Sequence, residues 1–76
     1  MIYDHYFDGR KPSKIQVIKC IKRGLSQGFS QFEISWGENW VTLEKGRAGP
    51  NIWHGHGWIK NISGSDLADQ FNQEAI

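Results

Sequence analysis

The chain has 76 residues, of which 38% are hydrophobic and 22% charged, and its formal net charge is +1. This composition excludes a disordered or fibrous protein, and the length predicts one small domain over residues 1–76. The single cysteine, Cys20, excludes an internal disulfide and a Cys-based zinc site. No apolar run approaches the roughly 20 residues of a membrane span. We therefore expect a soluble, cytoplasmic protein with no membrane partner.

Charge is distributed unevenly along the chain. Residues 1–30 carry six basic against two acidic residues, a net charge of +4, whereas residues 31–76 carry three against six, a net charge of −3. Such asymmetry indicates either a charged partner or attraction between the two halves of the chain.

The N-terminal third predicts a short strand followed by an amphipathic helix. Residues 2–7 are aromatic and β-prone and precede an Asp-Gly turn, a pattern that fits a short, edge-type strand. Ser13 and Gln16 form a capping-box pattern, so a helix is expected over residues 13–27, with Gly28 preferred over Gly24 as its C-terminal residue. On the polar, outer side of this helix lie the basic residues Lys19, Lys22 and Arg23.

The middle of the chain predicts a β-hairpin over residues 31–45, because apolar and polar residues alternate on both sides of a Gly-Glu pair at residues 37–38. Gly at the first of two loop positions fits a type II′ turn. With that turn, the hairpin parity puts Trp40 on the face opposite the core. The residues expected to share the core face are Phe32, Ile34, Trp36, Val41 and Leu43.

A loop over residues 45–51 leads into a third strand, expected over residues 52–60. Two parities are open for this strand, and either of its internal glycines could switch between them by forming a bulge. We favour the parity with Trp53 and Ile59 in the core, because the other one turns two histidines and a lysine inward at a high desolvation cost. In the favoured parity the residues beside Trp40 on the open face are His54, His56, Trp58 and Lys60.

A last helix is predicted over residues 65–74, capped by Ser63 or Ser65. The order is therefore β-α-β-β-β-α, an α+β fold with a three-stranded antiparallel meander and both helices on one face of the sheet. From Pro12 on, this helix–three-strand–helix order is similar to that of double-stranded-RNA-binding domains. The resemblance implies the layout and not RNA binding, because the last helix begins SGSDLAD, which is acidic where those domains place a basic cluster.

The sequence predicts no catalytic site. It contains no nucleophile motif and no phosphate-binding glycine loop, and Cys20 lies on the core side of its helix, where a thiol is usually inert. We therefore predict a protein that is not an enzyme and has no cofactor or small-molecule substrate. His54 and His56 resemble half of a metal site, whose third ligand would be His5, Asp4 or Glu44. Two ordinary surface histidines are the favoured interpretation.

Two functional hypotheses follow from these patterns. The first is a regulatory module that binds nucleic acid, or a nucleic-acid-processing protein, through a basic helix face and an aromatic open sheet face. The alternative is an inhibitor or adaptor, of the kind that mobile elements or phages encode, that blocks a surface of a partner protein. A purely structural interpretation is that residues 2–7 fold over the open-face tryptophans. The candidate binding residues are Lys19, Lys22, Arg23, Trp40, Lys45, Arg47, His54, His56, Trp58 and Lys60.

Overall fold

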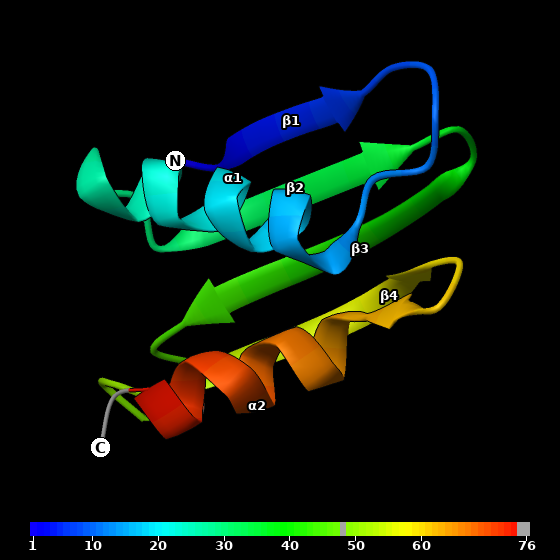
Figure 1. The fold of residues 1–76 in the computed structure, drawn as a ribbon. Helices are drawn as coiled ribbons and strands as arrows, with labels where there is room; N and C mark the ends of the chain where they lie inside the picture. Colours follow the sequence, from blue (N-terminus) through cyan, green and yellow to red (C-terminus); the bar gives the residue numbers. More distant parts are fainter. Residues whose placement is uncertain (48, 75–76) are drawn as a thin grey trace.

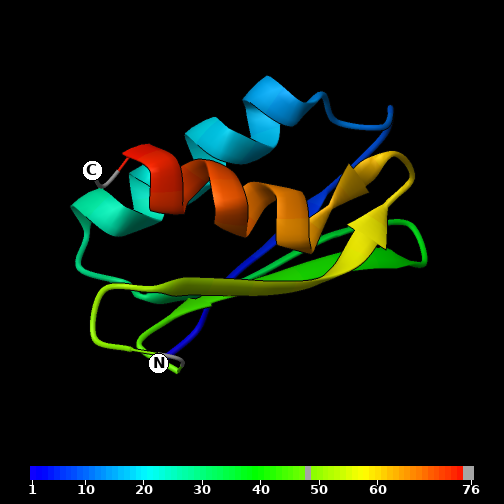
Figure 2. The ribbon, with the colours of Figure 1, turned by 90° about the horizontal axis from the view of Figure 1, so that it is seen from below.

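The strands form one five-stranded sheet in the order β1-β2-β3-β4-β5 (Figure 1). The computed structural model describes residues 1–47 and 49–74; Ala48, within the predicted loop, lies outside the described residues. Both helices cover the same face of the sheet, as Figure 2 shows from the side. In chain order the elements are β1 (Tyr3–Phe7), α1 (Lys14–Ser26), β2 (Gln31–Trp36), β3 (Asn39–Lys45), β4 (Trp53–Ile59), β5 (Ile62–Ser63) and α2 (Gly64–Glu74).

The predicted α+β class and element order are confirmed, but the sheet is larger than the predicted three-stranded meander. β2, β3 and β4 pair antiparallel as expected. β1 adds a fourth strand, parallel to β2, and the two-residue β5 pairs back onto the end of β4. β1 and β2 can run parallel because the segment between them, which contains α1, crosses over the sheet. Neighbouring parallel strands need such a crossover, because a short hairpin loop would make them antiparallel.

Local signals fix both ends of α1. The capping box is formed: the backbone N–H of Ser13 donates to Oε1 of Gln16 at 2.7 Å, and the N–H of Gln16 donates to Oγ of Ser13 at 3.2 Å. At the other end Gly28 adopts a φ of +94°, and the N–H of Phe29 donates back to the carbonyl of Gly24 at 3.1 Å. This is the bonding of a Schellman motif, so the helix ends where the sequence predicts.

The β2–β3 hairpin has the predicted register. Gly37 adopts a φ of +59° in a two-residue loop, and Ile34 pairs with Val41. Both side chains are buried on the face that the helices cover. Trp36 lies on the same face, but it is only half-buried at the margin of the core, where its indole Nε1 donates to the carbonyl of Gly9 at 2.9 Å. The prediction that Trp36 is a core ring therefore holds only in part.

β4 is shorter than the predicted strand. It ends at Ile59, because Lys60 adopts a left-handed conformation with a φ of +53° and reverses the chain towards β5. Ile59 then pairs with Ile62 on the return strand. Figure 2 shows this end of β4 curving towards the helix layer. Lys60 thus lies in a turn and is not an outward-facing residue of the strand, which corrects the prediction.

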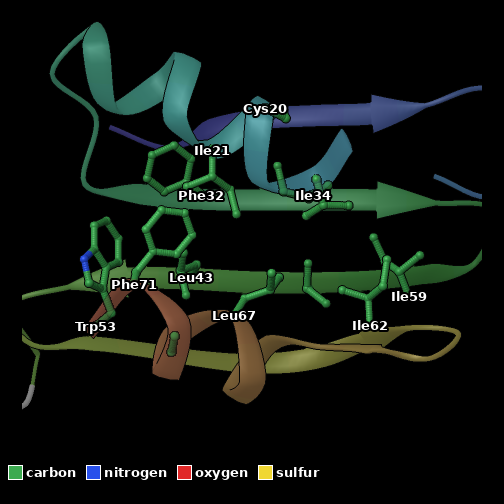
Figure 3. Close-up of a cluster of buried hydrophobic side chains, with 13 residues drawn as sticks. Cys20, Ile21, Phe32, Ile34, Leu43, Trp53, Ile59, Ile62, Leu67 and Phe71 are labelled. Carbon is green, nitrogen blue, oxygen red and sulfur yellow. The ribbon is translucent and has the colours of Figure 1, made fainter. Parts of the chain in front are cut away.

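The core lies between the sheet and the two helices. Figure 3 shows the rings of Phe32, Trp53 and Phe71 together, with centroids of Trp53 and Phe71 5.7 Å apart. The buried hydrophobic residues are Val17, Cys20, Ile21, Phe32, Ile34, Val41, Leu43, Trp53, Ile59, Ile62, Leu67, Ala68 and Phe71.

Within residues 1–47 and 49–74, neither helix has the length and apolar character that a membrane span requires.

The glycines of β4 have two different roles. A Cβ atom on Gly55 would overlap the carbonyl group of Gly64, at the start of α2, so this glycine permits the close approach of the helix. Gly57 instead adopts a left-handed conformation, with a φ of +84°.

The helix α2 is capped by Ser63, whose Oγ accepts from the N–H of Asp66 at 3.2 Å. Of the two predicted capping residues, the structure therefore selects Ser63.

Candidate binding face of the sheet

One face of the sheet is left uncovered by the helices, and we call it the open face. Strand register arranges its side chains in rows that cross the strands. The favoured parity of β4 is confirmed, since Trp53 and Ile59 are buried on the covered face. The three rows of the open face are Tyr6, Ser35, Trp40 and Trp58; Asp4, Glu33, Thr42 and His56; and Gln31, Glu44 and His54.

The first row, which we call the aromatic row, has three accessible aromatic side chains beside Ser35. Tyr6 is 58% exposed, Trp40 50% and Trp58 65%. Trp40 and Trp58 are directly opposite on neighbouring strands, and they border a shallow depression together with His56 and Gly57. The Trp40 ring lies against the backbone of Gly57, where a Cβ atom would stand 2.7 Å from ring atom Cε3. Trp40 therefore covers the backbone of Gly57, whereas Trp58 is the more exposed of the two rings.

The interpretation in which the N-terminal segment folds over these rings is wrong. β1 lies beside β2 in the plane of the sheet, with Tyr6 opposite Ser35. It therefore extends the open face and does not cover Trp40 or Trp58. Tyr6 was missed as a site residue because the alternation in residues 2–7 shows which side chains share a face, but not which strand they lie beside.

Three of the seven side chains in the other two rows are acidic. Asp4 and Glu33 are exposed, and Glu44 is half-buried. The guanidinium of Arg47 pairs with Glu44, with Nη1 3.2 Å from Oε1. Phosphate groups approaching the second and third rows would therefore meet like charges, of which this arginine offsets one.

The predicted basic residues do not join the aromatic row. Lys19, Lys22 and Arg23 are exposed on α1, in the helix layer on the other side of the sheet, where Nζ of Lys22 lies 3.7 Å from Oε1 of Glu74. Lys45 shares the parity of the covered face, and its Nζ lies 5.9 Å from the centre of the Trp53 ring. From its turn, Lys60 reaches the ring of Trp36, with Nζ 5.8 Å from the centre.

The ten predicted binding residues are thus divided between two sides of the molecule. A ligand seated on the aromatic row would not reach the α1 lysines, because the sheet and its core lie between them. The residues that the structure brings together on and beside the open face are Trp40, Arg47, His54, His56 and Trp58. Those that it places elsewhere are Lys19, Lys22, Arg23, Lys45 and Lys60.

The two histidines of β4 converge on the open face. Their Nε2 atoms are 2.7 Å apart, and the rings meet edge to face with centroids separated by 4.4 Å. By register His54 faces Glu44 and His56 faces Thr42 on β3. Within residues 1–47 and 49–74, no group of three or more His, Cys, Asp or Glu is arranged to hold a metal ion. In the described part of the chain, none of His5, Asp4 and Glu44 forms with the pair the third ligand that such a site would need.

Cys20 does not contribute a reactive group to the surface. Its side chain is buried between α1 and the sheet. Burial raises the pKa of the thiol, and the nearby positive charge of Arg23 opposes that effect only in part. The thiol form therefore predominates near neutral pH, and this form is a poor nucleophile.

Comparison with protein-family models, with curated proteins and with solved structures finds no match for this chain.

Proposed function

We propose that this protein is a non-catalytic module that binds another protein through the open face and acts as an inhibitor or adaptor. The observation that supports this most is the aromatic row, in which Trp40 and Trp58 stand side by side and half or more exposed. Exposed tryptophans in a patch are the residues that most often dominate the affinity of protein interfaces.

The size of the surface is compatible with such an interface. A standard interface covers about 800 Å² on each partner. This area is roughly one sixth of the accessible surface of 4996 Å², so one face of the sheet can supply it. The partner surface would bury the two tryptophan rings at its centre and leave the acidic rows at its rim, where charges affect the association rate more than the affinity.

Charge favours a protein over a nucleic acid at this face. Nucleic-acid affinity depends on basic side chains that neutralise phosphates. On the open face Arg47 is already paired with Glu44, and Asp4 and Glu33 repel phosphates. Stacking of bases on Trp40 and Trp58 would have to overcome this repulsion.

Nucleic-acid binding remains a second candidate, on a different surface. Lys19, Lys22 and Arg23 form an exposed basic patch on α1. That patch supports contacts to phosphates without any contribution from the aromatic row. The two candidates therefore predict sensitivity to different substitutions.

Capture experiments with immobilised protein, with and without nuclease, separate the two candidates. We expect a nuclease-resistant partner that Trp58→Ala binds about thirtyfold or more weakly, as for a hot-spot residue. The double variant Lys19→Glu with Lys22→Glu should retain it, as should Ile15→Ala, which removes an exposed apolar side chain from α1. Loss of capture on nuclease treatment, together with loss in the lysine variant alone, would instead support the nucleic-acid candidate.

A further inference from the structure

We propose that His54 and His56 form a chelating site for a divalent transition-metal ion that prefers imidazole ligands, such as Zn²⁺ or Ni²⁺. The site would bind the ion through the two Nε2 atoms, which point at each other across 2.7 Å. This proposal goes beyond the binding of a partner protein and does not depend on it. It also differs from the expectation drawn from the sequence, in which the two residues were ordinary surface histidines.

The rings of His54 and His56 lean towards each other on the open face. Residues two apart on a strand point to the same face, but their Cα atoms are separated by roughly 6.5 Å. Side chains that stand straight out from the sheet keep about that spacing. Here the rings of His54 and His56 lean together until their Nε2 atoms come within hydrogen-bond distance. Such a contact requires one ring to donate its Nε2–H while the other offers a lone pair, so the pair holds one proton between two basic nitrogens.

An ion can bind between the two Nε2 atoms after a small movement of the rings. Zn–N bonds of about 2.0–2.1 Å at a tetrahedral angle need ligand nitrogens roughly 3.3 Å apart. The pair is closer than that by about 0.6 Å, which a rotation of either ring supplies. His56 is exposed and His54 half-buried, so neither ring is held in place by core packing. The ring that donates Nε2–H then moves its proton to Nδ1, so that both neutral imidazoles offer an Nε2 lone pair to the ion.

The surroundings favour a cation. By register Glu44 faces His54 and Thr42 faces His56. A depression of about 230 Å³ lies beside His56 and is bordered by Thr42, Glu33 and Glu44. Arg47 also borders this depression and is paired with Glu44, so Glu33 is the carboxylate that lowers the electrostatic energy of a positive ion there. In the described part of the chain no third ligand completes the set. The ion would therefore keep coordination positions open to water or to a donor atom of a bound molecule, as accessible metal sites do.

The chain supplies a matched control. It has three histidines, and the third, His5, lies on β1 with its ring 4.5 Å from that of Phe7. By register it faces the side of the sheet on which Ile34 is buried. A site made by the pair on β4 should therefore be unaffected when His5 is replaced.

Isothermal titration calorimetry with ZnCl₂ and NiCl₂ tests the proposal without a partner protein. We expect one ion per chain, and an affinity about a hundredfold lower in His54→Gln and in His56→Gln, because each variant loses the benefit of chelation. His5→Gln should bind as the unchanged protein does. MgCl₂ should give no binding, since Mg²⁺ prefers oxygen ligands. Quenching of tryptophan fluorescence by Ni²⁺ should be lost in the same two variants, because Trp58 and Trp40 border the same depression as His56.

Three results would overturn the proposal. One is the absence of saturable Zn²⁺ or Ni²⁺ binding below millimolar concentrations. Another is unchanged affinity in both His54→Gln and His56→Gln. The third is an equal loss in His5→Gln, which would indicate nonspecific coordination by single imidazoles. Thermal melts of each variant, which are expected to match the unchanged protein, exclude unfolding as the cause of any loss.

Discussion

The two faces of the sheet are built from the same strands, yet only one of them contributes to the core. On the covered face Trp53 is 6% exposed and packs against Phe32 and Phe71. On the open face, five residues further along the same strand, Trp58 is 65% exposed. The chain therefore has more large apolar surface than its core uses. The surplus is concentrated in one row, where it is available for binding.

The largest effect is expected on the covered face. Trp53→Ala removes a buried ring that contacts two others and should lower the free energy of unfolding by about 3–5 kcal/mol. That is comparable with the whole stability of a domain of this size, so the variant should be largely unfolded at 25 °C. Chemical denaturation monitored by circular dichroism measures the loss. Trp53→Phe, which keeps an aromatic ring, should lose clearly less. A loss below about 1 kcal/mol would contradict the assignment of Trp53 to the core.

A smaller but still large effect is expected where the covered face meets α2. Gly55→Ala places a methyl group against the backbone of Gly64, which cannot move without moving the helix. We expect a loss of about 1–3 kcal/mol, the usual cost of overpacking. The neighbouring substitution His54→Ala, on the open face, is the control and should cost less than about 0.5 kcal/mol. Equal melting temperatures of the two variants would show that α2 does not approach β4 as closely as described.

Within the open face, Trp40 and Trp58 should differ. Trp40→Ala exposes the backbone of Gly57, because the Trp40 ring lies against it. We therefore expect a loss of about 1–2 kcal/mol, from roughly half the burial of a core ring. Thermal melts compared with those of Trp53→Ala measure it. A loss as large as that of Trp53→Ala would show that Trp40 is a core residue. It would contradict the assignment of Trp40 to an exposed face of the sheet.

The smallest effect is expected for Trp58→Ala. Its ring is the most exposed of the aromatic row, so the free energy of unfolding should fall by less than about 1 kcal/mol. The melting curve should stay cooperative, and this variant can then be used to measure binding without a change in folding. A larger loss of stability than in Trp40→Ala would reverse the order that the exposed fractions predict.

Much of the fold could be predicted because its signals are local. The capping box at Ser13 and the left-handed Gly28 fix α1, and Gly37 fixes the register of the hairpin. The parity of β4 followed from the cost of burying two imidazoles. Each of these inferences depends on residues that are within a few positions of one another, or on the chemistry of single side chains.

The remaining features depend on contacts between distant residues. No local pattern shows that β1 pairs with β2, since Tyr3 and its partner Phe32 are linked only through the crossover helix. The division of the candidate site has the same origin. Lys60 was expected on the open face, but its left-handed conformation ends the strand. In the sequence only charge and loop position point to Lys45, whereas in the structure its long side chain extends over the Trp53 ring.

The parallel pairing of β1 also has a consequence for the order of folding. β2, β3 and β4 are consecutive, and β2 and β3 are joined by a two-residue loop, whereas Tyr3 must find Phe32 across a long stretch of chain. Such non-local pairing carries a higher entropic cost and forms slowly. We expect β1 to join last and to open first, so that its amides exchange with deuterium faster than those of β3. When β1 is detached, the edge of β2 becomes available to an identical segment of a second molecule, which is the route to strand exchange between copies.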